Sequence, residues 1–173
     1  GVDGEKVAIL SPMIPAQPIT PDYRNRQNQL IYSGKFAEEW YTEEIIRAAQ
    51  QLTDKDVTFC IVGDKFQGDL RARKGAIQQA FQETANIDWM GAVSRAESQA
   101  YIAQSDIGIS WRSETIDNDA SVELSTKLLE YARLGKPVLL RRTKMHEQLL
   151  GADYELFVDT EADFFGEDTT CLI

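Results

Sequence analysis

Short apolar segments alternate with amphipathic helical segments along most of this chain, and that alternation limits its fold more than any other feature. Apolar segments predict strands at residues 30–33, 57–62, 87–90, 106–110, 137–140 and 154–158. Helical patterns separate them at residues 42–52, 69–85, 94–104, 125–134 and 144–150. Nearly continuous apolar strands joined by helices indicate a parallel sheet covered on both faces. The sequence therefore predicts an α/β, Rossmann-like, doubly wound sheet of about six strands.

The length of the chain fits one domain. Its 173 residues can enclose a sizeable core, and they also fit one half of a two-domain enzyme. Residues 1–28 hold most of the prolines and show no sustained period, so we expect an extended lead-in. Residues 29–173 are expected to form the Rossmann-like domain.

Charge and cysteine content narrow the partners. The net charge of −10 argues against nucleic acid, because a surface that binds a duplex must neutralise several phosphates. Cys60 and Cys171 form neither a metal spacing nor a disulfide framework, which indicates a reducing cytoplasm. No apolar run approaches the roughly 20 residues that span a bilayer. The basic residues Arg141, Arg142 and Lys144 are more typical of solvated surface, and they leave peripheral association with the cytoplasmic membrane face open.

The expected strand order predicts where a ligand binds. In a doubly wound sheet, the crevice lies at the carboxyl ends of the first and fourth strands. Gly34 and Lys35 follow the first strand, and a loop at residues 111–121 follows the fourth. Ser125 and Thr126 then begin a helix whose unpaired backbone N–H groups and dipole favour a phosphate.

Lys127 and Glu130 lie one turn apart at the edge of the apolar stripe of that helix. An ammonium beside a phosphate, and a carboxylate that accepts two hydroxyl hydrogen bonds, would suit the diphosphate and ribose of a nucleotide. The same spacing equally fits an ordinary ion pair on a helix surface. From spacing alone, the two interpretations stay open.

The run STKLLEYARLGKPVLL, at residues 125–140, resembles the nucleotide-binding motif of GT-B glycosyltransferases of the family 4 type, the glycosyl transferases group 1. The runs LIYSGKF, VTFCIVGD and IDWMGAVSRAESQAYIAQSDIGIS are similar, in order, to the segments around the first four strands of that family. GVD at the start is similar to the end of its interdomain linker. The resemblance covers residues 29–158 and implies the C-terminal, donor-binding domain of such an enzyme.

The resemblance also implies roles for individual residues. Lys127 would contact the donor diphosphate and Glu130 the ribose hydroxyls, which makes these two the catalytic candidates. Glycine and lysine after the first strand would lie near the phosphates, and backbone around the end of the third strand would read the base. The donor-binding candidates are Gly34, Lys35, Gly91, Val93, Glu123, Ser125 and Thr126.

Two positions depart from the family pattern. Many members have an acidic residue near the donor sugar, eight positions before the ribose glutamate, where this chain has Val122 followed by Glu123. Many also have a second basic residue shortly after the first glycine turn, where this chain has Trp40. Lys127 would then carry more of the phosphate charge.

The function implied by the resemblance is transfer of a sugar from a nucleotide-diphosphate sugar to a glycan or lipid-linked acceptor, in polysaccharide or glycoconjugate biosynthesis. It implies no cofactor and no metal, and it favours retention at the sugar carbon, with inversion left open. The acceptor would bind an N-terminal domain absent from this sequence, so the isolated chain would be inactive. A non-catalytic nucleotide-binding or regulatory module, or a nucleotide-sugar epimerase-like domain, shares this architecture and is the alternative.

Other residues whose side chains could take part in catalysis or ligand binding have more ordinary explanations. His146, the single histidine, is expected in surface or boundary packing. Trp111 is expected to cap the fourth strand by packing rather than to stack on a ligand. The acids Glu114, Asp117 and Asp119 are expected to be solvated rather than to hold a metal ion.

Overall fold

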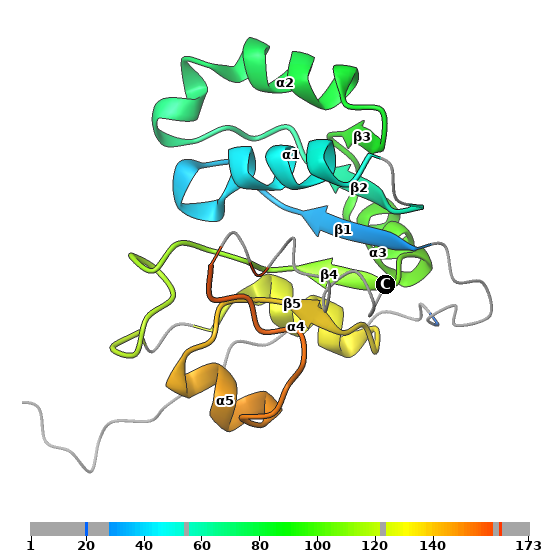
Figure 1. Cartoon of the computed structure of the whole chain (residues 1–173). Helices are drawn as coiled ribbons and strands as arrows, with labels where there is room; N and C mark the ends of the chain where they lie inside the picture. Colours follow the sequence, from blue (N-terminus) through cyan, green and yellow to red (C-terminus); the bar gives the residue numbers. More distant parts are fainter. Residues whose placement is uncertain (1–19, 21–27, 54–55, 122–123, 161–162, 164–173) are drawn as a thin grey trace, which may run out of the picture.

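The computed structural model describes residues 20, 28–53, 56–121, 124–160 and 163, which form a parallel sheet with helices on both faces (Figure 1). Within these residues, five strands pair in the order β3-β2-β1-β4-β5. The strands are β1 (Gln29–Ser33), β2 (Thr58–Val62), β3 (Ile87–Gly91), β4 (Ile107–Ile109) and β5 (Val138–Leu139). This order confirms the doubly wound topology and places β1 beside β4, where the chain reverses its direction across the sheet.

Helices connect the strands in the expected places. The α-helices are α1 (Thr42–Gln51), α2 (Lys74–Glu83), α3 (Arg95–Gln104), α4 (Thr126–Arg133) and α5 (Lys144–Leu150). Two short 3-10 helices, η2 (Glu38–Trp40) and η3 (Gly68–Arg71), precede α1 and α2. The helix predicted at residues 69–85 is therefore divided into η3 and a shorter α2.

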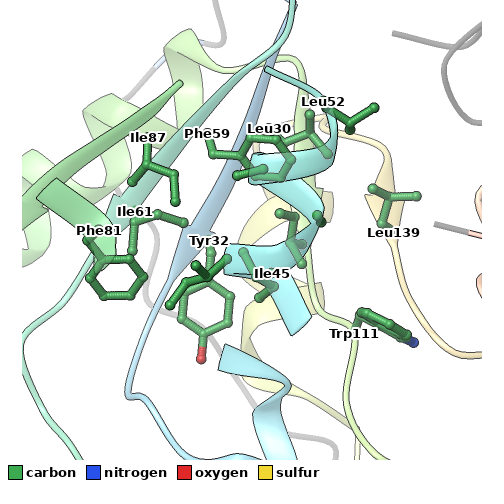
Figure 2. Close-up of a cluster of buried hydrophobic side chains, with 14 of the residues drawn as sticks. Leu30, Tyr32, Ile45, Leu52, Phe59, Ile61, Phe81, Ile87, Trp111 and Leu139 are labelled. Atoms are coloured by element: carbon green, nitrogen blue, oxygen red, sulfur yellow. The ribbon is translucent and has the colours of Figure 1, made fainter. Parts of the chain in front are cut away.

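Alternate residues of β1 face opposite sides of the sheet. Leu30 and Tyr32 pack with α1 and α2, and Figure 2 shows Ile45 of α1 and Phe81 of α2 in the same cluster. Ile31 packs on the other face with buried residues of α3 and α4. Because both faces of the strand are covered, its three central residues, 30–32, are apolar in succession rather than alternating.

The predicted strand at residues 154–158 is reduced to a single bridge beside β5, so within the described residues the sheet has five strands rather than about six. Phe157 makes an isolated parallel bridge with Leu140. The Tyr154 hydroxyl accepts a hydrogen bond from the Val138 N–H at 2.7 Å and donates one to the Val138 carbonyl at 3.0 Å. Tyr154 thus satisfies the edge groups of Val138 with its side chain. Backbone pairing is confined to Leu140, whose N–H donates to the Leu156 carbonyl at 3.3 Å and whose carbonyl accepts from the Val158 N–H at 2.9 Å.

Tyr131 fixes α4 against the centre of the sheet. Its ring packs so close to β4 that a Cβ on Gly108 would lie 2.4 Å from it. Its hydroxyl accepts a hydrogen bond from the Ser33 N–H at 3.0 Å and donates one to the Ile31 carbonyl at 3.3 Å. These contacts hold α4 beside the carboxyl end of β1.

Candidate functional site

A pocket of about 340 Å³ lies at the carboxyl ends of β1 and β4, where the strand order predicts a ligand crevice. Four segments form it: the turn after β1, the end of η2, the start of the loop after β4, and the N-terminal half of α4. Its lining residues are Ser33, Gly34, Lys35, Trp40, Arg112, Ser125, Thr126, Lys127 and Glu130. The structure therefore brings together six of the residues proposed from sequence, namely Gly34, Lys35, Ser125, Thr126, Lys127 and Glu130.

Two glycines allow the chain to approach itself closely at the turn after β1. The Gly34 N–H donates to the Val62 carbonyl at 2.9 Å, which ties this turn to the end of β2. A Cβ on Gly63 would lie 2.0 Å from the Gly34 carbonyl oxygen, and a Cβ on Gly34 would lie 2.6 Å from Cε of Lys127. The turn is thus narrow enough for the Lys127 side chain to pack directly against it.

Lys127 is a half-buried cation in this pocket. Its Nζ lies 4.8 Å from the Tyr32 ring centroid and 5.3 Å from the Trp40 ring centroid. No ion pair joins this ammonium to an acid among the residues that the structure describes. Burial, with repulsion from Arg112 as the second cause, lowers the pKa of Lys127 to about 8. The side chain is therefore mostly protonated at neutral pH. Two aromatic faces lie against its charge, and the Asp117 and Glu130 carboxylates stabilise it through space without a direct ion pair among the described residues.

The N-terminus of α4 offers backbone donors to the same pocket. Ser125 precedes the helix but makes no side-chain capping hydrogen bond. Its Oγ instead accepts a hydrogen bond from the Ser110 Oγ at 3.1 Å. The first N–H groups of α4 are consequently left to solvent or to a ligand, next to the ammonium of Lys127.

Glu130, one turn further along α4, pairs with an arginine from another helix. Arg95 of α3 donates to Oε1 of Glu130 at 3.0 Å, and both side chains are partly exposed. No ion pair joins Glu130 to Lys127 within the described residues, so the interpretation of these two as a mutual surface pair is wrong. Each residue instead has its own environment in the pocket.

Arg112 and Asp117 form a buried ion pair at the start of the loop after β4. Nε and Nη2 of Arg112 donate to the two carboxylate oxygens of Asp117, at 3.0 and 2.5 Å. The two residues are 5% and 2% exposed, so the expectation that Asp117 is solvated is wrong. Arg112 was not predicted from sequence, because a pair within an irregular loop has no periodic pattern that would indicate burial.

Two candidates for base recognition do not line this pocket. The Gly91 carbonyl accepts a hydrogen bond from the Gly63 N–H at 2.8 Å, and Val93 packs against the apolar cluster beneath α4. Both precede Arg95, which reaches Glu130, so the β3–α3 turn adjoins the Glu130 side of the pocket. Their role stays a prediction.

Some sequence predictions fall outside the described residues. Val122 and Glu123 are among these, so sugar contact by Glu123 stays a prediction. The expected lead-in at residues 1–28, apart from residues 20 and 28, also lies outside them, as does Cys171.

The residues with ordinary explanations have mainly structural contacts. His146 is buried rather than at the surface, and its Nδ1 lies 2.7 Å from the Arg141 carbonyl oxygen. Trp111 is buried in the cluster of Figure 2, with its ring centroid 4.5 Å from that of Tyr41, which confirms the packing role. Neither side chain lines the pocket.

The acidic loop and the basic cluster compensate one another in part. Asp119 accepts a hydrogen bond from the Lys144 N–H at 3.0 Å and pairs with its ammonium, and Arg142 pairs with Glu147 and Asp159. Among the described residues, no three His, Cys, Asp or Glu side chains lie close enough to hold a metal ion. In the same part of the chain, no helix combines the length and apolarity needed to cross a membrane.

Comparison with known protein families gives one match over most of the chain. A model of the family described as "Glycosyl transferases group 1" matches residues 27–167. No curated protein matches this chain by sequence.

Solved structures share the fold at low sequence identity. HepE of Anabaena, in complex with UDP and glucose, is 15% identical with a TM-score of 0.63, over 85% of this chain and 39% of its own. A mutant of TarM from S. aureus, in complex with fondaparinux, alpha-GlcNAc-glycerol and UDP, is 12% identical with a TM-score of 0.61, over 90% of this chain and 30% of its own. The catalytic domain of the Helicobacter pylori cholesterol-alpha-glucosyltransferase is 13% identical with a TM-score of 0.52, over 79% of each chain. This chain thus spans between 30% and 39% of the HepE and TarM chains.

Proposed function

The chain belongs to the group 1 glycosyl transferases, and from that premise we propose that its pocket binds the nucleoside diphosphate part of a sugar donor. Its doubly wound sheet is one Rossmann-like domain of the GT-B type. HepE and TarM, which share this fold, were solved with UDP. UDP is accordingly the first nucleotide to test here.

The observation that carries this proposal is the excess of positive charge in the pocket. Lys127 is half-buried with no ion-pair partner among the described residues, and Lys35 and Arg112 line the same 340 Å³. The start of α4, where Ser125 makes no side-chain capping hydrogen bond, adds the positive end of a helix dipole. A diphosphate supplies the negative charge and acceptor oxygens that complement this arrangement.

Glu130 is proposed to bind the ribose. Its Oε1 is paired with Arg95, whereas no partner of Oε2 is found among the described residues. An ionised carboxylate can accept hydrogen bonds at both oxygens, and two neighbouring hydroxyls of a ribose donate two. The β3–α3 turn, with Gly91 and Val93, would then lie toward the base.

The chemistry proposed for Lys127 is electrostatic. When the bond between the sugar carbon and the diphosphate breaks, negative charge grows on the departing diphosphate. A cation and N–H groups held in place before the reaction stabilise that charge without reorganisation. The stabilisation is larger in the transition state than in the ground state, which is the condition for catalysis.

The acceptor is proposed to be a glycan or lipid-linked molecule, bound by another domain of the complete enzyme at the cytoplasmic membrane face. We assign retention at the sugar carbon and a place in polysaccharide or glycoconjugate biosynthesis on the family resemblance alone. Acceptor positioning and exclusion of water account for much of the rate in group transfer. This chain by itself should therefore bind the donor and transfer no sugar.

Binding is tested first, by thermal melting and calorimetry of the chain with UDP, ADP, GDP and uridine. A ligand that binds the native state raises the melting temperature, so one diphosphate should stabilise the chain more than its nucleoside does. The absence of any response to all three diphosphates would refute the donor site.

Transfer is tested separately with nucleotide sugars and glycan or lipid-linked acceptors. The chain should release no nucleoside diphosphate in an acceptor-dependent manner. Turnover on the order of 1 per second would show a complete enzyme instead. Donor binding together with changed sugar configuration, without an acceptor, would indicate the epimerase-like alternative.

A further inference from the structure

Arg112 is fixed more firmly than any other basic residue of the pocket. Two of its guanidinium nitrogens are held by the carboxylate of Asp117, and the pair is almost wholly buried. Its carbonyl oxygen also accepts a hydrogen bond from Nε of Arg141 at 3.1 Å. Both the backbone and the side chain of Arg112 are therefore anchored before any ligand arrives.

The hydrogen bonds to Asp117 use one edge of the guanidinium and leave another. A guanidinium has five N–H donors in a fixed planar fork, and Asp117 contacts Nε and Nη2. No hydrogen bond from Nη1 is found among the described residues, although Arg112 lines the pocket. Because the guanidinium is rigid and planar, its Nη1 donors point away from the Asp117 carboxylate. They could therefore bind an oxyanion in the pocket while the pair with Asp117 stays intact.

Arg112 and Lys127 also act on each other electrostatically. Repulsion from Arg112 is the second cause of the lowered pKa of Lys127, after burial. Two cations that share a small pocket are unfavourable in the empty protein, and an anion between them removes that repulsion. The nearby carboxylate of Asp117 is already paired with Arg112, so it offsets the repulsion between Arg112 and Lys127 only in part.

We propose that Arg112, oriented by Asp117, is a second phosphate-binding residue of the pocket, acting opposite Lys127 on the same diphosphate. This inference rests on the proposed donor site and deepens it, because it assigns the loop after β4 to the phosphates. Lys127 reaches the ligand from α4, whereas Arg112 reaches it from the end of β4. Asp117 is a positioning residue that acts through Arg112.

The alternative is that the Arg112–Asp117 pair only closes the loop at residues 111–121. In that case, breaking the pair would disturb the pocket as a whole and weaken every ligand in proportion. A phosphate contact predicts a selective loss instead. Binding of UDP should weaken while binding of uridine, which has no phosphate, stays the same.

The test compares the wild-type chain with Arg112→Lys and Arg112→Ala. Calorimetry measures the affinity for UDP, and NMR titration measures the affinity for uridine. Arg112→Ala removes a charge-assisted hydrogen bond, so its affinity for UDP should be roughly 10-fold lower or more. Arg112→Lys should also weaken it, because a single ammonium cannot hold Asp117 at two points and still present a planar fork. Arg73→Lys is the matched control, since Arg73 pairs with exposed Glu43 away from the pocket and should bind UDP as the wild type does.

Thermal melting shows which variants are folded. If Arg112→Ala does not fold, Asp117→Asn replaces it, because this change keeps the guanidinium and weakens its anchor. A selective loss of affinity for UDP in Asp117→Asn supports the inference, and unchanged affinity for UDP overturns it. Unchanged UDP affinity in the folded Arg112 variants, or an equal loss of UDP and uridine, also overturns it. A wild-type chain that binds no nucleoside diphosphate would overturn the proposed function together with this inference. If the wild type binds UDP, the proposed function stands, and the Arg112 variants test the inference alone.

Discussion

The two sides of the pocket differ in how their charges are balanced. On the side of β1 and β4, Lys35, Arg112 and Lys127 line the cavity, and Asp117 is the acid paired with one of them. On the side of α3, Glu130 forms an ion pair with Arg95 at 3.0 Å. The first side thus carries excess positive charge, whereas the second side is neutral.

This difference indicates how each side can respond to a ligand. An anion can enter beside Lys127 without breaking an existing ion pair. A ligand at Glu130 must instead share the carboxylate with Arg95 or displace it, and that exchange offsets part of the gain. Substitutions on the cationic side should therefore weaken nucleotide binding more than substitutions at the Glu130–Arg95 pair.

The largest effect is expected for Lys127→Ala. Removing the ammonium should weaken UDP binding by about 1.5 to 3 kcal/mol, the range for a hydrogen bond to a charged group, with little change for uridine. Calorimetry measures both. Lys74→Ala is the control, because Lys74 pairs with Asp64 and does not line the pocket. Equal losses for UDP and uridine would remove the phosphate role from Lys127.

The next effect concerns the packing that positions α4. Gly108→Ala introduces a methyl group 2.4 Å from the Tyr131 ring, which is wholly buried. Overpacking of this kind should lower the free energy of unfolding by about 1 to 3 kcal/mol, and it should weaken UDP binding by displacing Lys127. Urea denaturation measures the first effect and calorimetry the second. Gly75→Ala in α2 is the matched control, because a methyl group there meets no atom within 4 Å; comparable destabilisation by both changes would contradict this account.

A smaller effect should follow pH. The protonated form of Lys127 binds phosphate, and burial lowers its pKa to about 8, so UDP affinity should fall as the pH rises through that value. At pH 9 about a tenth of such a group stays protonated, which would weaken binding by about 1 kcal/mol. Calorimetry at pH 7, 8 and 9 measures this trend. Lys127→Ala should show no such trend. A wild-type affinity that stays constant from pH 7 to 9 would mean that Lys127 does not titrate in this range or does not contact the phosphate.

The smallest effects are expected at the neutral side. Glu130→Gln keeps the shape and loses the charge that strengthens hydroxyl hydrogen bonds, so UDP binding should weaken by about 0.5 to 1 kcal/mol. Arg95→Ala, which removes the partner of Glu130, should change UDP affinity and stability less, since exposed ion pairs contribute at most about 1 kcal/mol. Calorimetry ranks the two variants. A loss at Glu130 greater than that at Lys127 would reverse the comparison between the two sides.

Much of the site could be predicted from the chain itself. Gly34 and Lys35 follow an apolar strand, and Thr126 and Lys127 begin an amphipathic helix, so the topology rule for doubly wound sheets brings them together. The expected strand at residues 154–158 is shortened to pairing at Leu140, because the Tyr154 side chain already satisfies the edge groups of Val138. An apolar run shows a tendency to be buried, and it does not show which backbone groups are already paired.

The layers, the strand order and the position of the crevice could be predicted from the chain, because they follow from local periodicity and from general rules of chain connection. The balance of charges is visible only in the folded protein. Arg95 reaches Glu130 across 35 residues of chain, and Asp117 is buried beneath Arg112 rather than solvated. The energy of a charge depends on its burial and on neighbours from distant segments, and neither quantity is present in the local pattern. For that reason the sequence could name Lys127, and only the fold shows it half-buried in one pocket with Arg112, with no ion-pair partner among the described residues.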